Sequence, residues 1–263
     1  MSQAADEVRL KFERSRRHLA ELGNEIKSYL DREPFHVHSE EDEATGDLVF
    51  RVEVRESPPV ALGLPLGDAI HSARSALDYL AWQLVVAGGG TPGVNTMFPI
   101  SETETKFHGD YERRLQGASA SAVVAVQALR PFGGGDDRFW RLHKLDIEDK
   151  HRLLIPVGAA HASVNVSFTF ADMDPAFADM DPVVLGLNPA DRQYPLQDGA
   201  EIFRVMRGAR ESSNVGMGGA HSFTFDVAFG EGVIVSGEPI MPTLADLIQD
   251  IENSVSPLLK FLN

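Results

Sequence analysis

The sequence contains no cysteine among its 263 residues. It can therefore form no disulfide, and it offers neither a thiolate ligand for a metal nor a cysteine nucleophile. Basic residues are also scarce, because 24 lysines and arginines stand against 39 acidic residues and give a formal net charge of −15. Sequence-independent binding of nucleic acid relies on basic surface, so this balance argues against broad nucleic-acid binding. Residues 11–18 (KFERSRRH) are one candidate for a local basic patch, and the alternative interpretation, which we favour, is a solvated helix face with Glu–Arg pairs.

Long hydrophobic runs are missing as well. The longest, residues 77–90 (LDYLAWQLVVAGGG), is too short and too interrupted to cross a bilayer, so no membrane span is expected. The N-terminal segment is charged from Asp6 onward and lacks the apolar core of a signal peptide. Together these absences predict a cytoplasmic protein. Hydrophobic residues make up 43% of the chain, which is enough to build the core of a globular protein of this length.

Helical periodicity dominates the first 155 residues. Apolar residues recur three and four positions apart, and glycines or prolines interrupt the pattern between segments. Helices are predicted over residues 4–32, 66–86, 103–116, 118–129 and 139–154. Between the first two, residues 35–54 alternate in polarity around the polar turn DEATGD, which predicts a β-hairpin.

Strand-like alternation begins after Pro156. Strands are predicted over residues 162–173, 201–207, 221–230 and 232–238. The end of the chain, residues 243–262, predicts a closing helix that Pro257 bends or splits.

This order of elements predicts an α+β fold, with a helical N-terminal half packed on or beside a mostly antiparallel β-sheet and a closing C-terminal helix. If the hairpin joins the later sheet, residues 1–263 form a single domain. The alternative is a helical domain over 1–155 followed by a β-rich domain over 156–263. The hexapeptide FADMDP occurs twice in residues 170–182, which we interpret as a surface loop lengthened by duplication.

Charged residues form a stripe along the helix predicted over 66–86. His71, Arg74 and Asp78 stand at positions i, i+3 and i+7, which places them in line beside the apolar face of the helix. They are almost the only charges in a helix otherwise suited to burial.

A second stripe with the same spacing occurs in the helix predicted over 139–154. It consists of His143, Asp146 and Lys150, with Asp149 near the apolar side of the helix and His151 turned toward another face. Because the order of signs differs between the two stripes, they can neutralise each other when the helices face one another.

The two stripes are expected to pair across the helices. Arg74 would pair with Asp146 or Asp149, and Asp78 with Lys150 or His143. Such a network has two interpretations. It either orients two helices through satisfied polar contacts, or it forms a cleft in which the titration of the histidines is shifted.

A histidine beside an arginine and a carboxylate can act as a general base and stabilise a developing anion, which suits phosphodiester or acyl hydrolysis. His71 and His143 are the acid–base candidates, Arg74 would stabilise the anion, and Asp78 and Asp146 would orient the histidines. The same nitrogen and oxygen atoms are capable metal ligands, but the spacing lacks an H-E-x-x-H pattern. No metal and no other cofactor is therefore predicted.

Three separated segments, DAIHSARSALDYLAWQL, FPI and LHKLDIEDKHRLL, occur in this order within roughly residues 60–155. This combination resembles a widespread group of uncharacterised bacterial proteins that share an H-x2-R-x3-L-D helix, an FPI loop and a D-K-H-R element. The resemblance implies a bacterial source and no particular mechanism.

The segment from Arg138 to His143, RFWRLH, satisfies the R-x4-H spacing of HEPN domains, although Phe139 stands where a polar residue is usual. HEPN domains are helical bundles that often act as metal-independent ribonucleases, in which the arginine and histidine work on the scissile phosphate, commonly across a dimer. This resemblance implies a metal-independent phosphodiester hydrolase and allows a homodimer. The alternative is a non-catalytic binding or interaction protein in which the stripes are structural salt bridges.

Overall fold

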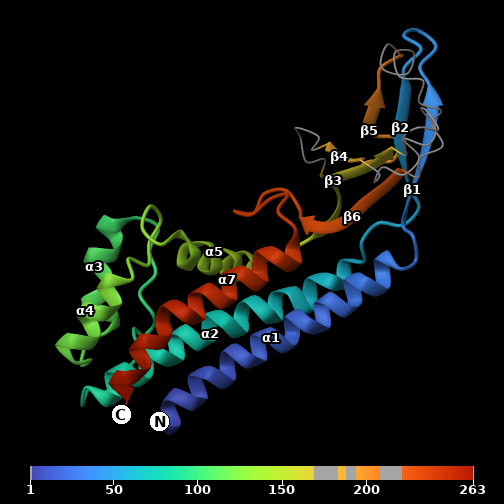
Figure 1. The fold of residues 1–263 in the computed structure, drawn as a ribbon. Coiled ribbons are helices and arrows are strands. Elements are labelled where there is room, and N and C mark those ends of the chain that lie inside the picture. Colours follow the sequence, from blue (N-terminus) through green and yellow to red (C-terminus); the bar gives the residue numbers. More distant parts are fainter. Residues whose placement is uncertain (1, 169–182, 188–193, 208–220, 263) are drawn as a thin grey trace.

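A computed structural model of the chain describes residues 2–168, 183–187, 194–207 and 221–262. The duplicated FADMDP segment lies outside these ranges. The described elements form an α+β fold, in which helices run alongside one another and the strands gather beyond one end of them (Figure 1). Both chain ends lie at the opposite end of the helices (Figure 1).

The long helices α1 (Gln3–Leu30), α2 (Gly63–Ala87) and α7 (Ile240–Val255) form the body of the molecule. Helix α1 packs along α2 and α7, and α5 (Asp137–His151) packs on α2 and α7. Ser2 caps α1 by accepting a hydrogen bond from the Ala5 N–H. The remaining helical elements are α3 (Glu104–Arg114), α4 (Ala120–Ala128) and the short 3₁₀ helices η1 (Val60–Leu62) and η4 (Ser256–Leu262).

The core is built around α2, which is buried on more sides than its sequence predicts. The predicted apolar face is buried, with Leu77 and Leu80 fully inaccessible. The opposite side, for which periodicity predicts water or a light contact, is covered by α1: Ala76 is inaccessible, and Tyr79 donates a hydrogen bond to Glu7 of α1. The helix therefore needs small or apolar residues on both sides, since α1 and α5 each pack against it.

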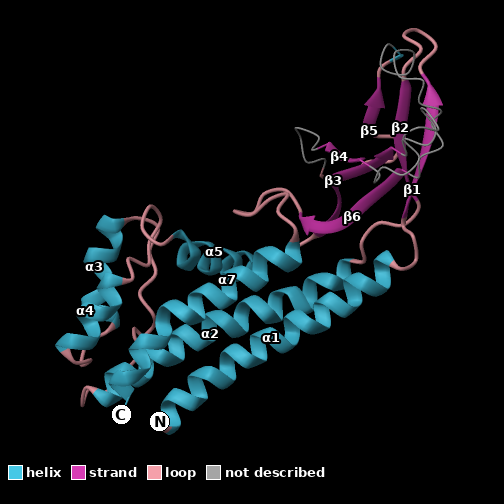
Figure 2. Cartoon of the chain, viewed as in Figure 1, coloured by secondary structure: helices cyan, strands magenta, loops and turns pink. Residues whose placement is uncertain are grey.

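The strands form two three-stranded antiparallel sheets beyond the helices (Figure 2). In one sheet the hairpin strands β1 (Phe35–Glu41) and β2 (Leu48–Val54) are extended by β5 (Glu201–Val205). The other has the order β4-β3-β6, with β3 (Pro156–Phe168) central between β4 (Val183–Leu187) and β6 (His221–Phe229). The predicted hairpin is thus confirmed, and it does pair with a later strand.

The strand predicted over residues 232–238 is wrong, because this segment forms a series of turns before α7. Gly232 and Gly237 adopt positive φ angles of 83° and 77°, which an extended strand does not allow. The main chain closes on itself, since the Gly237 N–H donates to the Phe229 carbonyl. The closing helix begins at Ile240 and continues after Val255 as the 3₁₀ helix that contains Pro257.

Two glycines allow the segment around the C-terminal end of α5 to approach α2. A Cβ atom on Gly63 would lie 2.6 Å from the Leu154 carbonyl oxygen and 2.7 Å from Leu153 Cγ. A Cβ atom on Gly67 would lie 2.3 Å from Asp149 Oδ1. Real Cβ atoms do not come this close, so a larger residue at Gly63 must push main chain away, whereas one at Gly67 must displace the Asp149 carboxylate.

Replacing Gly63 with alanine should therefore destabilise the protein by about 1–3 kcal/mol, because the added methyl group meets main chain that cannot rotate away. Urea unfolding followed by circular dichroism measures the difference. Gly109→Ala is the matched control, since Gly109 is also helical and a Cβ atom there meets nothing within 4 Å. That change should stabilise by about 0.5–1 kcal/mol through helix propensity. Equal effects of the two changes would contradict the proposed close approach.

Candidate functional site

Helices α2 and α5 cross in antiparallel register along the two predicted stripes. Contacts join Gly67 to Asp149, His71 to Asp146 and Arg74 to His143. Residue numbers rise on α2 while they fall on α5, as an antiparallel pair requires. The expected meeting of the two stripes is confirmed, and it brings three of the four charged residue types of the protein, together with histidine, into one seam.

Asp146 is the centre of this seam. It is only 2% exposed, and its two carboxylate oxygens bind two different groups. His71 Nδ1 lies 2.9 Å from Oδ1, and Lys150 donates to Oδ2. A carboxylate oxygen accepts hydrogen bonds, so the His71 Nδ1–H donates to Oδ1, and Nε2 lies on the opposite side of the ring. The side chains of His71 and Lys150 are 59% and 51% exposed, so solvent reaches both partners of the buried carboxylate.

Arg74 and Asp78 hold the FPI segment onto α2. The guanidinium of Arg74 is buried and donates to Asp78 Oδ1 at 2.5 Å. The same carboxylate oxygen accepts the Phe98 N–H at 3.0 Å, while Arg74 NH2 lies 3.4 Å from the Phe98 carbonyl. The Phe98 ring stacks on Phe139 of α5, with 5.7 Å between ring centroids. The ion pair thus binds both main-chain polar groups of one loop residue.

His143 is a neutral histidine in this seam. Arg74 Nε donates to its Nδ1 at 3.4 Å, so the ring hydrogen sits on Nε2. Burial and then the positive charge of Arg74 lower the pKa of His143 to about 4, against an opposing effect of Asp146. At neutral pH this ring is a hydrogen-bond donor and acceptor without charge.

Asp149 lies against the bare main chain at Gly67. Burial raises the pKa of Asp149, and the nearby carboxylates of Asp146 and Asp68 raise it further. Three acidic groups therefore crowd this end of the seam, and Asp149 is the one whose charge the surroundings disfavour.

The predicted pairings across the helices are wrong in their partners. Arg74 pairs with Asp78 of its own helix, and Asp146 binds Lys150 of its own helix. The reason is spacing: residues four apart lie on the same face of one helix and meet without any tertiary contact. The histidines then make the contacts between helices. His151, also predicted for the site, is exposed at the end of α5 and takes no part in the hydrogen bonds of the described cluster.

Arg138, the arginine of the R-x4-H pattern, faces a different neighbour from His143. It pairs with Asp136 at 2.7 Å and with Asp250 of α7 at 3.2 Å. Five positions along an α-helix turn the side chain by about 140°, so the two residues of this pattern point apart. The arginine that contacts His143 is Arg74, from another helix.

The sequence pattern alone missed the role of three positions. The sequence marks Phe98 only as the first residue of the FPI segment, whereas the structure shows that α2 binds its main-chain amide and carbonyl groups. Gly67 stands four residues before His71, and a small residue at that spacing signals the close approach of another segment. Arg114, whose positive charge helps to lower the pKa of His143, gave no signal, since it follows Glu112 and Arg113 in a charged helix end.

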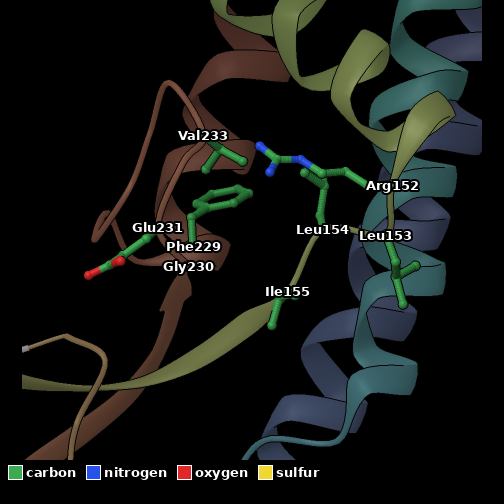
Figure 3. Close-up of a pocket in the computed structure, with 8 residues that line it drawn as sticks. All are labelled: Arg152, Leu153, Leu154, Ile155, Phe229, Gly230, Glu231 and Val233. Carbon is green, nitrogen blue, oxygen red and sulfur yellow. The ribbon is translucent and has the colours of Figure 1, made fainter.

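A small hollow lies at the point where the chain leaves α5 (Figure 3). Its volume is about 40 Å³, and it separates the segment after α5 from the loop after β6. The Arg152 guanidinium points toward Val233, whereas Leu153 turns to the other side (Figure 3). The lining residues are Arg152, Leu153, Leu154, Ile155, Phe229, Gly230, Glu231 and Val233. This hollow adjoins the D-K-H-R element and includes none of the residues bound to Asp146.

Two further structural findings concern ligands and membranes. In the described ranges, no group of three or more histidine, aspartate or glutamate residues is arranged to hold a metal ion. The helices of the same ranges include none with the length and apolarity that crossing a bilayer requires.

Comparison of the chain with family models, with curated proteins and with solved structures finds no match. The site must therefore be interpreted from its own geometry.

Replacing Arg74 with methionine should lower the free energy of unfolding by about 2–4 kcal/mol, since Asp78 and the Phe98 carbonyl lose their buried partner. Urea unfolding measures this loss. Arg113→Met is the control, because the exposed pair that Arg113 forms with Asp110 should contribute less than about 1 kcal/mol. Similar losses in both variants would show that the hold on Phe98 does not stabilise the fold.

His143 should make the protein less stable in acid. Its pKa is about 4 in the folded protein, below the ordinary histidine value of 6.5, so the unfolded chain binds the proton first as pH falls. The free energy of unfolding should decrease between pH 6.5 and pH 4, by up to about 3 kcal/mol from this group. Unfolding curves at several pH values test this effect. His143→Gln should show a shallower dependence over that window, and an unchanged slope would contradict the assignment.

Proposed function

We propose that the protein is a metal-independent hydrolase of phosphodiesters, with His71 as the proton-transferring group. The observation that carries this proposal is an exposed imidazole whose Nδ1 is bound by a buried carboxylate, Asp146. A histidine held in this way keeps one tautomer and one orientation, and the carboxylate stabilises the imidazolium that forms on proton uptake. A purely structural pair has no need to leave the imidazole side chain 59% exposed.

The position of Lys150 favours a negatively charged substrate. Its ammonium group binds the second oxygen of Asp146 and is half exposed beside His71. A phosphodiester carries one negative charge in the ground state and gains more at its non-bridging oxygens in the transition state. A cation beside the general base is therefore suited to phosphoryl chemistry, while the net charge of −15 restricts such attraction to this part of the surface.

RNA is the phosphodiester that we favour as substrate, because its 2′-hydroxyl supplies the nucleophile. In the proposed step, His71 Nε2 takes the 2′-hydroxyl proton as the 2′-oxygen attacks phosphorus. The bond from phosphorus to the 5′-oxygen breaks, and that oxygen receives a proton from the imidazolium or from water. The products are a cyclic phosphate and a free 5′-hydroxyl, and no oxidant or further reactant is needed.

A non-catalytic binding or interaction protein is the second candidate. It is favoured by the contacts of Arg74 and Asp78. These side chains bind each other and the main chain of Phe98, so few of their hydrogen-bonding atoms remain for a substrate. Under either proposal we place the protein in the bacterial cytoplasm.

The hydrolase proposal predicts that His71→Ala lowers the rate of RNA or bis(p-nitrophenyl) phosphate hydrolysis by about 10²–10⁴-fold while the protein stays folded. His108→Ala is a closely matched control. The His108 side chain is 57% exposed and lies 3.8 Å from Glu104, but that carboxylate is 61% exposed, unlike that of Asp146. The control should retain full activity.

Asp146→Asn extends the test, since the amide keeps the shape of the side chain but no longer stabilises an imidazolium. Its rate should fall along with that of His71→Ala, and circular dichroism should confirm the fold. A wild-type protein without activity on either substrate, or a His71→Ala variant as active as wild type, would favour the binding protein instead.

A further inference from the structure

An open groove lies between the C-terminal turns of α1 and the segment that leads into α2. Its volume is about 310 Å³, at the lower end of the range of small-molecule pockets. Glu25, Ser28 and Arg32 line it from α1, while Pro59 and Ala61 line it from the other side, where η1 packs on α1. None of its lining residues belongs to the seam between α2 and α5.

The buried part of the groove lining is apolar and fixed in place. Tyr29 and Leu62 are only 1% and 2% exposed. The Tyr29 hydroxyl donates to the Glu56 carbonyl at 2.7 Å, so its hydrogen is already used. Opposite α1, the Leu62 N–H donates to the Pro59 carbonyl at 3.0 Å, and the proline ring restricts the main chain there. The walls are therefore formed before any ligand arrives.

Arg32 is a cation of the groove whose charge is already compensated. Its guanidinium donates to both carboxylate oxygens of Glu56, at 2.6 and 3.1 Å, and to the Ser28 carbonyl at 3.0 Å. It also lies over the Tyr29 ring, 5.5 Å from the ring centroid. With its charge paired and its donors engaged, Arg32 offers little to an anionic ligand.

Glu25 is the charged residue of the groove that no cation neutralises. The positions three and four residues away on α1, where a helical partner would stand, hold Glu21, Leu22, Ser28 and Tyr29. Within the described part of the chain, the Glu25 side chain forms neither an ion pair nor a hydrogen bond. An uncompensated carboxylate beside an apolar surface, in a chain of net charge −15, favours a ligand with a positive charge.

We propose that this groove binds a small organic amine. The apolar body of the amine lies between α1 and η1, and its ammonium group pairs with the Glu25 carboxylate. Because an ion pair open to solvent adds little binding energy, the apolar contacts supply most of the affinity and Glu25 supplies the preference for positive charge. The site goes beyond the proposed hydrolysis, since binding of the amine requires neither His71 nor Asp146.

Three probes with similar bodies and different charges test this preference: phenethylammonium, neutral 2-phenylethanol and anionic 3-phenylpropanoate. The Ala61 methyl signal in NMR spectra of the full-length protein, identified by its loss in Ala61→Ser, should move with phenethylammonium and give a Kd of about 1 mM. The alcohol should bind about fivefold more weakly, and the anion more weakly still. An Ala61 signal that phenethylammonium leaves unmoved, or equal affinity for the three probes, would overturn the proposal.

Two glutamates on α1 provide a matched pair of variants. Glu25→Gln should weaken phenethylammonium binding by about fivefold and leave 2-phenylethanol binding unchanged. Glu21→Gln removes the same charge one helical turn away, from a residue that is 61% exposed, lies 3.6 Å from His18 and does not line the groove. It should retain the affinity of wild type. Equal weakening in both variants would show general attraction by negative charge and contradict a site at Glu25.

Filling the groove tests its location. Ala61→Phe should abolish binding of all three probes, because the added ring occupies the space of the ligand. Val60→Phe is the control, since Val60 is also exposed in η1 and lies outside the lining. Both changes are at exposed positions, and circular dichroism should show the wild-type fold in each. Undiminished binding in a folded Ala61→Phe variant would place the ligand elsewhere and refute this site.

Discussion

Arg74 is the buried charge on which the arrangement of the site depends. It contacts Asp78 on its own helix, the carbonyl of Phe98 in the FPI segment and His143 on α5. The FPI segment and the helices α2 and α5, which are separate in the sequence, are therefore joined through a single guanidinium. A leucine at this position would pack as well in the core but would offer none of the three segments a donor. The cost of burying the cation is offset by a bonded carboxylate and by two further acceptors.

Much of the fold followed from periodicity, and the failures have physical causes. Helices and the hairpin were predictable because apolar residues recur at the right spacing over long segments. Residues 232–238 alternate as a strand does, but two glycines with positive φ turn the chain, and alternation over a few residues does not distinguish the two outcomes. The burial of Ala76 and Tyr79 beneath α1 was not predictable from α2 alone, because it depends on which helix covers which face.

The seam between α2 and α5 was predictable in place but not in detail. The matching spacing of the two stripes located it correctly. The partners differ because residues four apart already lie beside each other on one helix, and the histidines make the contacts that bridge the helices. Periodicity does not predict how exposed each side chain is. Asp146 is buried, whereas His71 and Lys150, which contact it, are exposed to solvent. That contrast between a buried carboxylate and its exposed partners is what makes His71 an acid–base candidate.

The position of the loop at Phe98 is fixed by contacts to its main chain, and these contacts do not depend on which side chain the residue carries. Asp78 and Arg74 bind the amide and the carbonyl, which every residue but proline possesses in full. The side chain itself is selected elsewhere, by the face of Phe139 on which it stacks. Evolution can thus exchange the aromatic pair for another complementary pair while the loop stays where it is. The hydrogen bonds that Arg74 and Asp78 make with the main chain would hold the loop in place whichever side chain residue 98 carries.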